Sequence, residues 1–196
     1  MPTTHLLYLH GFRSSPQSMK AQKVARRVAL QHPGVVWWCP QLAISPAGAA
    51  AQIAQGTAGW PTERMAVVGS SLGGFYASWL AARTGCRAVL LNPAVHPARD
   101  LGRYIGEQTA WHDSQERFFF QPEYVGELAA LDANTPPHPT PSDVLAIVAK
   151  GDEVLDWRDM AARHASACLQ LLEGGDHALS DFDDLIDGVF DFLQLA

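Results

Sequence analysis

A serine flanked by glycines follows one short apolar run of the sequence and precedes a run rich in alanine and leucine. The segment is Gly69-Ser70-Ser71-Leu72-Gly73, a G-x-S-x-G pattern. Between a strand and a helix, this pattern forms a tight turn that favours glycine at the flanking positions and exposes the serine Oγ. We therefore predict that Ser71 is a nucleophile and that the N–H of Leu72 faces developing negative charge. The alternative is a glycine turn that serves only close packing.

A histidine and several carboxylates follow two later apolar runs, in the chain order serine, acid, histidine. His177 stands in a glycine-containing loop before the last helical stretch, where a general base could reach the serine. Asp152 directly follows the run at residues 144–149, so we predict that it orients the imidazole, and Asp156 is the alternative. Asp176 is adjacent to the histidine and is expected to fix the loop.

The segment after the first apolar run supplies the remaining features of an acyl-transfer site. His10-Gly11-Phe12 predicts a second oxyanion donor in the Phe12 N–H, with His10 orienting the loop. Ser14 and Ser15 are candidates for the substrate pocket, and a plain turn role fits them equally well. The other histidines lack metal-binding spacing, and phosphate-binding and dinucleotide-binding glycine patterns are absent. We expect neither a metal nor an organic cofactor.

Positioning these residues requires a sheet whose strands all end at one edge. Apolar runs at 6–9, 35–38, 65–68, 88–91, 144–149 and 168–172 alternate with helical stretches at 18–31, 72–84, 123–131, 157–167 and 182–195. Continuous apolar runs are typical of parallel strands covered on both faces, and ligands gather at the carboxyl ends of such strands. The pattern predicts an α/β fold with a mostly parallel sheet of about six strands flanked by helices, in one domain over residues 1–196.

The stretch between the fourth and fifth runs interrupts this alternation. We expect residues 102–141 to form a small cap or lid within the domain and to cover the active site. Phe118, Phe119 and Phe120 are more apolar than a solvated loop should be, so Phe118 and Phe119 are candidates for the substrate pocket. The alternative is that the three rings only pin the insertion to the core.

Charge and composition exclude several classes of partner. The 196 residues carry 14 Lys and Arg against 20 Asp and Glu, a net charge of −6 that disfavours nucleic acid and anionic membranes. The basic cluster from Lys20 to Arg27 has the spacing of a solvated helix face. Cys39, Cys86 and Cys168 form no C-x-x-C pair and are expected to be buried free thiols. With no secretory signal or membrane-length apolar run, we expect a soluble cytoplasmic protein, a monomer or homodimer.

Together these segments resemble the α/β-hydrolase superfamily and, more closely, its YqiA-type esterases. The matching pieces are Tyr8 to Phe12 with Ser14 to Pro16 and Lys20, Pro40 to Leu42, Gly69 to Tyr76, Asn92 to Val95, Gly151 to Asp156, and Gly174 to Ala178. Residues 102–141 match poorly. The resemblance implies a serine esterase with its triad on Ser71, Asp152 and His177 and its oxyanion donors on Phe12 and Leu72.

The residues and the resemblance predict hydrolysis of a small carboxylic ester through an acyl-enzyme. We expect acyl chains of about two to six carbons, because the insertion is too small to enclose a long tunnel and a large alcohol site together. An acyl-CoA thioesterase would use the same triad and would be favoured by a basic rim at Arg13 and Lys20. A non-catalytic binding protein on this scaffold is a third hypothesis, although such a protein normally lacks a triad member.

Overall fold

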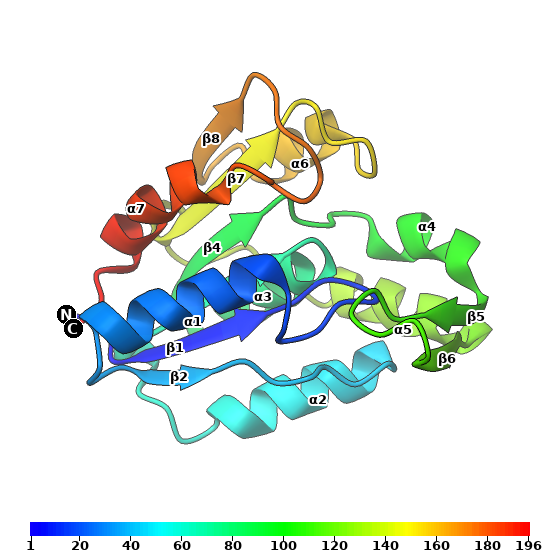
Figure 1. Cartoon of the computed structure of the whole chain (residues 1–196), viewed down its shortest axis with the longest axis horizontal. Helices are drawn as coiled ribbons and strands as arrows, with labels where there is room; N and C mark the ends of the chain where they lie inside the picture. Colours follow the sequence, from blue (N-terminus) through cyan, green and yellow to red (C-terminus); the bar gives the residue numbers. More distant parts are fainter.

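The computed structural model describes residues 1–196 and places six parallel strands in one sheet (Figure 1). The strands are β1 (His5–Leu9), β2 (Val36–Trp38), β3 (Met65–Ser70), β4 (Arg87–Leu91), β7 (Val144–Ala149) and β8 (Cys168–Leu172). Their order is β2-β1-β3-β4-β7-β8. The chain therefore winds outward from β1 to β2 and then returns to β3, so β1 and β3 are neighbours at a switch in winding direction. Loops after such a pair diverge and leave room for a ligand.

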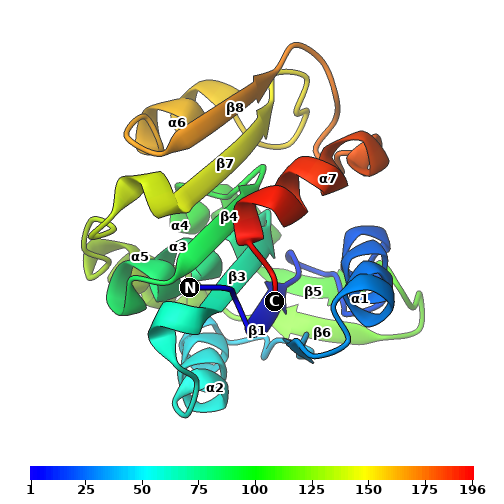
Figure 2. The ribbon, with the colours of Figure 1, turned by 90° about the vertical axis from the view of Figure 1, so that its left-hand side faces the viewer.

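Helices cover both faces of the sheet, as Figure 2 shows edge-on. One face carries α1 (Met19–Gln31) and α7 (Phe182–Leu193), and the other carries α2 (Pro46–Thr57), α3 (Leu72–Thr84) and α6 (Trp157–Arg163). Successive strand residues point to opposite faces. Leu6 and Tyr8 therefore join the core under α1 and α7, whereas Leu7 and Leu9 join the core under α2 and α3.

The predicted α/β fold is confirmed, and each predicted strand and helix is present close to its expected boundaries. The expectation that every run is covered on both faces is wrong for β2 and β8. These two strands form the edges of the sheet, and Val36 and Leu171 on them are 47% and 38% exposed. An apolar run by itself does not reveal whether its strand lies at an edge.

Sequence analysis did not predict helix α2, because its residues are small and show no clear helical periodicity. Ser45 begins it by accepting a hydrogen bond from the N–H of Gly48 at 3.1 Å. Gly56 lets the helix approach the ring of Trp38 closely, since a Cβ there would lie 1.9 Å from the ring. Ala49 and Ile53 are fully buried in the core beside α3.

The insertion at residues 102–141 divides into two parts with different surroundings. After α4 (Pro97–Leu101) and the turn η2 (Gly102–Tyr104) comes an antiparallel hairpin of β5 (Gly106–Thr109) and β6 (Arg117–Phe120), followed by α5 (Pro122–Ala133). Helix α5 packs on α2, where Glu127 Oε2 accepts hydrogen bonds from Ser45 Oγ and the Ala47 N–H, each at 2.8 Å. The helix thus belongs to the α2–α3 layer. The hairpin lies beside the loop that follows β1.

The cysteines only partly match the prediction of buried thiols. Cys86 is buried, Cys39 is partly buried and Cys168 is exposed, and all three are free. Cys168 begins the edge strand β8, which explains its exposure. No helix is both long enough and apolar enough to cross a membrane.

The basic cluster on α1 is not the uniformly solvated face that its spacing predicts. Lys23 pairs with Asp183 and Arg27 pairs with Asp187, which joins α1 to α7 across their shared face of the sheet. Lys20 is partly buried instead, and its Nζ donates a hydrogen bond to the carbonyl of Ala178. Long-range packing of α7 and its preceding loop against α1 causes this difference.

Candidate active site

Ser71 occupies a strained turn between β3 and α3. Its φ is +56° and its ψ is −120°, a conformation that residues other than glycine rarely adopt. A Cβ on Gly69 would lie 2.2 Å from the Gly73 carbonyl oxygen, and a Cβ on Gly73 would lie 2.0 Å from the Leu9 carbonyl oxygen. Glycine is therefore required at both positions by the close approach of β3, α3 and β1. This steric requirement explains the G-x-S-x-G spacing.

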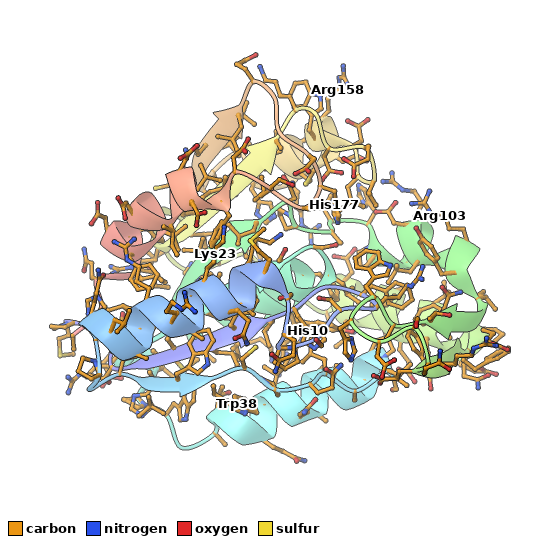
Figure 3. All side chains as sticks on the ribbon, viewed as in Figure 1. His10, Lys23, Trp38, Arg103, Arg158 and His177 are labelled. Carbon is orange, nitrogen blue, oxygen red and sulfur yellow. The ribbon has the colours of Figure 1, made fainter.

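The structure brings Ser71, His177 and Asp152 into one hydrogen-bonded chain. Ser71 Oγ lies 3.0 Å from His177 Nε2, and His177 Nδ1 lies 2.7 Å from Asp152 Oδ2. The three residues follow β3, β8 and β7, whose carboxyl ends share one edge of the sheet. Figure 3 shows His177 on the loop after β8. Because the carboxylate accepts from Nδ1–H, the neutral ring presents Nε2 as the acceptor for the serine proton.

Burial and backbone contacts hold the Asp152 carboxylate in place. Its side chain is fully buried, and the His177 side chain is 11% exposed. Asp152 Oδ1 accepts hydrogen bonds from the N–H groups of Val154 and Leu155, both at 2.8 Å. One carboxylate oxygen is thus fixed by the backbone and the other is left for the imidazole.

The other candidate acids serve local structure. Asp156 caps α6 by accepting from the Arg158 N–H at 2.9 Å, and Asp176 accepts from the N–H and Oγ of Ser180 at 2.8 and 2.6 Å. Neither contacts the ring of His177, so Asp152 is the acid that the fold brings to it. Three or more His, Cys, Asp or Glu side chains do not gather anywhere as a metal-binding group.

Asn92 is a further residue of the site to which sequence analysis gave no role. It is completely buried after β4 with a φ of +42°, and its Nδ2 donates to the carbonyls of Asp176 and His177 at 3.0 and 3.2 Å. Its Oδ1 accepts from the Ala149 N–H at 2.8 Å. Asn92 therefore ties the histidine loop to the ends of β4 and β7. A polar residue directly after a buried strand was the available signal.

The two predicted oxyanion donors lie in segments that meet at Ser71. Leu72 begins α3, and the loop carrying Phe12 passes so close that a Cβ on Gly11 would lie 3.2 Å from Ser71 Cβ. The N–H groups of Phe12 and Leu72 donate no hydrogen bond within the protein. Unpaired N–H groups beside a nucleophile are what an oxyanion hole requires.

His10 organises the loop that carries Phe12. Its Nε2 accepts from the Leu42 N–H at 3.1 Å, so its Nδ1 carries the proton and donates to the Gly11 carbonyl at 2.9 Å. Burial lowers the pKa of His10, which keeps this ring neutral. The arrangement agrees with an orienting role.

Two cavities border both Ser71 and His177. The smaller, of about 50 Å³, is mainly apolar and includes Phe12, Leu72, Ala94, Leu101, Tyr104 and Leu155. The larger, of about 350 Å³, lies toward the start of α1 and includes Ser14, Ser18, Lys20 and Glu153. A third cavity, of about 70 Å³, borders Phe12 and Phe118 without reaching Ser71.

Only some of the predicted pocket residues reach these cavities. Ser14 borders the larger cavity, whereas Phe118 borders only the third. Ser15 is buried, and its Oγ accepts from the Gln17 N–H at 3.1 Å, so it is a turn residue. Phe119 is 51% exposed because alternate residues of β6 point to opposite sides. Ser15 and Phe119 therefore border none of these three cavities.

The phenylalanine cluster of β6 packs against the predicted oxyanion loop. The Phe12 ring centroid lies 5.5 Å from that of Tyr104, 5.8 Å from that of Phe118 and 5.2 Å from that of Phe120. Phe120 is almost completely buried in the main core. Phe120 therefore pins the insertion, and Phe118 supports the ring of Phe12.

Two hydrogen bonds join the hairpin to the same loop. The Trp111 N–H donates to the Arg13 carbonyl at 2.8 Å, and Arg13 Nε donates to the Thr109 carbonyl at 2.7 Å. The side chain of Trp111 is 66% exposed and borders both cavities at Ser71. The hairpin is thus attached to the loop that carries Phe12 and reaches the edge of the site.

The family model described as Uncharacterised protein family (UPF0227) matches residues 5–194. The chain belongs to this family. It is the YqiA-like family that the motifs resemble, and the match includes every residue of the Ser71–His177–Asp152 chain.

Solved structures share the fold at low sequence identity. A putative hydrolase from Agrobacterium vitis S4 is 18% identical with a TM-score of 0.75, covering 98% of this chain and 91% of that one. Est1E from Butyrivibrio proteoclasticus is 20% identical with a TM-score of 0.73, covering 98% and 87%. Mouse alpha/beta hydrolase domain-containing protein 10 is 16% identical with a TM-score of 0.68, covering 95% and 91%. The fold is that of the α/β hydrolases.

Proposed function

We propose that this protein is a serine esterase that hydrolyses short-chain carboxylic esters through an acyl-enzyme. The observation that carries the proposal is the continuous chain from Ser71 Oγ through His177 to the buried Asp152, at 3.0 and 2.7 Å. The unpaired N–H groups of Leu72 and Phe12 beside it support acyl transfer in particular, because they suit a tetrahedral oxyanion.

The reaction follows from these contacts. Ser71 Oγ attacks the acyl carbon while its proton passes to His177 Nε2, and the new imidazolium is stabilised by the Asp152 carboxylate. The tetrahedral oxyanion accepts hydrogen bonds from the Leu72 and Phe12 N–H groups. Its collapse breaks the bond to the alcohol oxygen, which takes the proton from Nε2. Water then attacks the acyl-enzyme with the same histidine as base, releasing the acid and restoring Ser71.

The preference for short acyl chains is supported by the small apolar cavity at Ser71. Its walls include Leu72, Ala94 and Leu155 from the main fold and Tyr104 from the insertion. We infer that the hairpin and the turn before it act as a partial cap, forming one wall of the acyl site without enclosing it.

A series of p-nitrophenyl esters from acetate to palmitate, assayed below their micelle concentrations, tests this function. We expect kcat/KM to peak at about two to six carbons, because each further methylene must be buried to contribute binding. Ser71→Ala provides the blank, and a fluorophosphonate probe should label Ser71. A steady rise to palmitate, or activity that persists in Ser71→Ala, would contradict the proposal.

Acyl-CoA hydrolysis remains a second candidate because two arginines border the small cavity. Arg13 and Arg103 form no ion pair within the protein, so both are available to phosphate groups at the rim of the site. Butyryl-CoA and p-nitrophenyl butyrate share an acyl group, and their kcat/KM values separate the candidates. A strong preference for the thioester that is lost in Arg103→Met would favour the thioesterase.

A further inference from the structure

The larger cavity at Ser71 has a mainly apolar surface, but it also includes several polar groups that the proposed reaction does not use. It has a volume of about 350 Å³ and lies between the start of α1 and the loop that carries His177. Lys20 and Ser18 of the α1 end and Ser14 of the preceding loop border it, as do Ser71 and His177. Any group bound there therefore lies next to the reacting ester.

Lys20 gives this cavity a positive charge with unused hydrogen-bonding capacity. Its Nζ donates to the Ala178 carbonyl and forms no ion pair with a carboxylate. An ammonium carries three donors, so one carbonyl does not satisfy it. Burial lowers the pKa of Lys20 to about 8, which reflects poor hydration of the charged form.

The start of α1 adds further donors. The side chain of Ser18, the N-terminal cap, makes no capping hydrogen bond, and the first turn contains no acidic residue. The N–H groups of Met19, Lys20 and Ala21 find no acceptor within the protein. A 13-residue helix with an uncapped start provides partial positive charge as well as these donors.

No nearby acid forms an ion pair with Lys20, although the charges of Asp176 and Asp152 act on its ammonium group. Glu153 Oε2 accepts from the backbone N–H of His177 at 3.0 Å, and the Asp176 carboxylate accepts from Ser180. Their charges still reach the cavity, so a single negative charge suits it better than two. These groups match a carboxylate rather than a phosphate dianion.

We propose that this cavity is a carboxylate subsite and that the substrate is an ester whose alcohol portion carries a carboxylate that reaches Lys20. The inference rests on the proposed esterase function and names its substrate class. His177 must return a proton to the leaving oxygen, and Ala178, which holds Lys20, directly follows it. Both cavities border Ser71 and His177, so we assign the small cavity at Leu72 and Leu155 to the acyl chain and the larger one, which reaches Lys20, to the leaving group.

Two esters with the same acyl group test the proposal: 4-(butyryloxy)benzoate and its neutral counterpart 4-(butyryloxy)benzamide. We expect wild-type kcat/KM to favour the carboxylate by about tenfold or more, the range of one charge-assisted hydrogen bond. Lys20→Met should abolish the preference and Lys20→Arg should preserve it. Lys23→Met, three residues along α1 and paired with Asp183, is the matched control and should preserve it fully.

Equal kcat/KM values for the two esters in the wild type, or a preference that survives in Lys20→Met, would overturn the subsite. A charge preference seen only with p-nitrophenyl succinate, which carries its carboxylate on the acyl side, would also overturn it.

Binding to Ser71→Ala separates this inference from the esterase function itself. Calorimetry should show tighter binding of 4-hydroxybenzoate than of 4-hydroxybenzamide, again by about tenfold, and Lys20→Met in the same background should remove the difference. If 4-hydroxybenzoate binds more tightly but the wild type hydrolyses no ester, the esterase function is wrong and the carboxylate subsite is supported. If the wild type hydrolyses esters but the two ligands bind equally, the esterase function is supported and the carboxylate subsite is wrong.

Discussion

The proposed triad and the β5–β6 hairpin border the same candidate site, yet they are held in place by different interactions. Ser71 and Asp152 follow the buried strands β3 and β7, whereas His177 follows the edge strand β8 on a loop that Asn92 holds through two hydrogen bonds. Backbone hydrogen bonds continue past the ends of β3 and β4: the Ser71 N–H donates to the Leu91 carbonyl at 3.0 Å, and the Asn92 N–H donates to the Ile147 carbonyl at 2.9 Å. The hairpin has only two strands of its own and exposes Trp111 and Phe119.

Under the proposed function, this difference separates the reacting groups from the groups that select the substrate. Proton transfer depends on distances of 2.7 and 3.0 Å, which a hydrogen-bonded sheet can maintain. The hairpin is joined to the site through the Arg13 hydrogen bonds and the rings around Phe12. Changes at the strand ends should therefore reduce kcat severely, whereas changes in the hairpin should have smaller effects that depend on the acyl group.

The largest effect is expected from Ser71→Ala. Loss of the nucleophile should reduce kcat by about 10⁶-fold, with folding intact because only a hydroxyl is removed. Ester turnover and the melting temperature measure the two effects. Ser70→Ala is the adjacent control. If Ser70→Ala loses activity and Ser71→Ala keeps it, Ser70 and not Ser71 is the nucleophile.

Asp152→Asn should reduce kcat by about 10⁴-fold, because the amide no longer stabilises the required tautomer and the imidazolium. Asp156→Asn is the matched control, since that carboxylate caps α6 and pairs with Arg158 without contacting His177. Steady-state kinetics on p-nitrophenyl butyrate compare the two variants. If Asp156→Asn proves the crippling change, the assignment of the acid is wrong.

Asn92→Leu should reduce kcat by roughly 10- to 100-fold, because it leaves the carbonyls of Asp176 and His177 and the N–H of Ala149 without partners. KM should change little if Asn92 positions the histidine loop and does not contact substrate. The melting temperature should also fall. Asn134→Ala, at the exposed end of α5, is the control. If kcat is unchanged while the melting temperature falls, Asn92 stabilises the fold but does not position His177 for catalysis.

The smallest effect is expected in the hairpin. Phe118→Ala removes the edge-to-face contact with Phe12 and should lower kcat/KM for butyrate roughly two- to tenfold, the range for one aromatic pair. Phe119→Ala, whose ring is exposed, should change it less than twofold. If Phe118→Ala lowers kcat/KM as much as Asp152→Asn does, the proposed difference between the hairpin and the strand ends is wrong.

Local features of the sequence were sufficient to predict the elbow and the strands. The contact that requires Gly69 lies within the same segment, at Gly73, and is therefore local. The contact that requires Gly73 is with Leu9 of β1, and the sequence reveals it only through the known turn pattern. The apolar runs likewise mark β3, β4 and β7 almost residue for residue. Parallel strands with ligands at their carboxyl ends then predict that Ser71, Asp152 and His177 converge.

The tertiary structure decided which other side chains meet at that edge. Asn92 reaches the histidine loop because β4 lies beside β7, and Lys20 is partly buried because the loop before α7 crosses the start of α1. Residues far apart in the chain make these contacts, and the contacts depend on strand order and helix packing. Neither leaves a local pattern, because periodicity and turn sterics report only on neighbours along the chain.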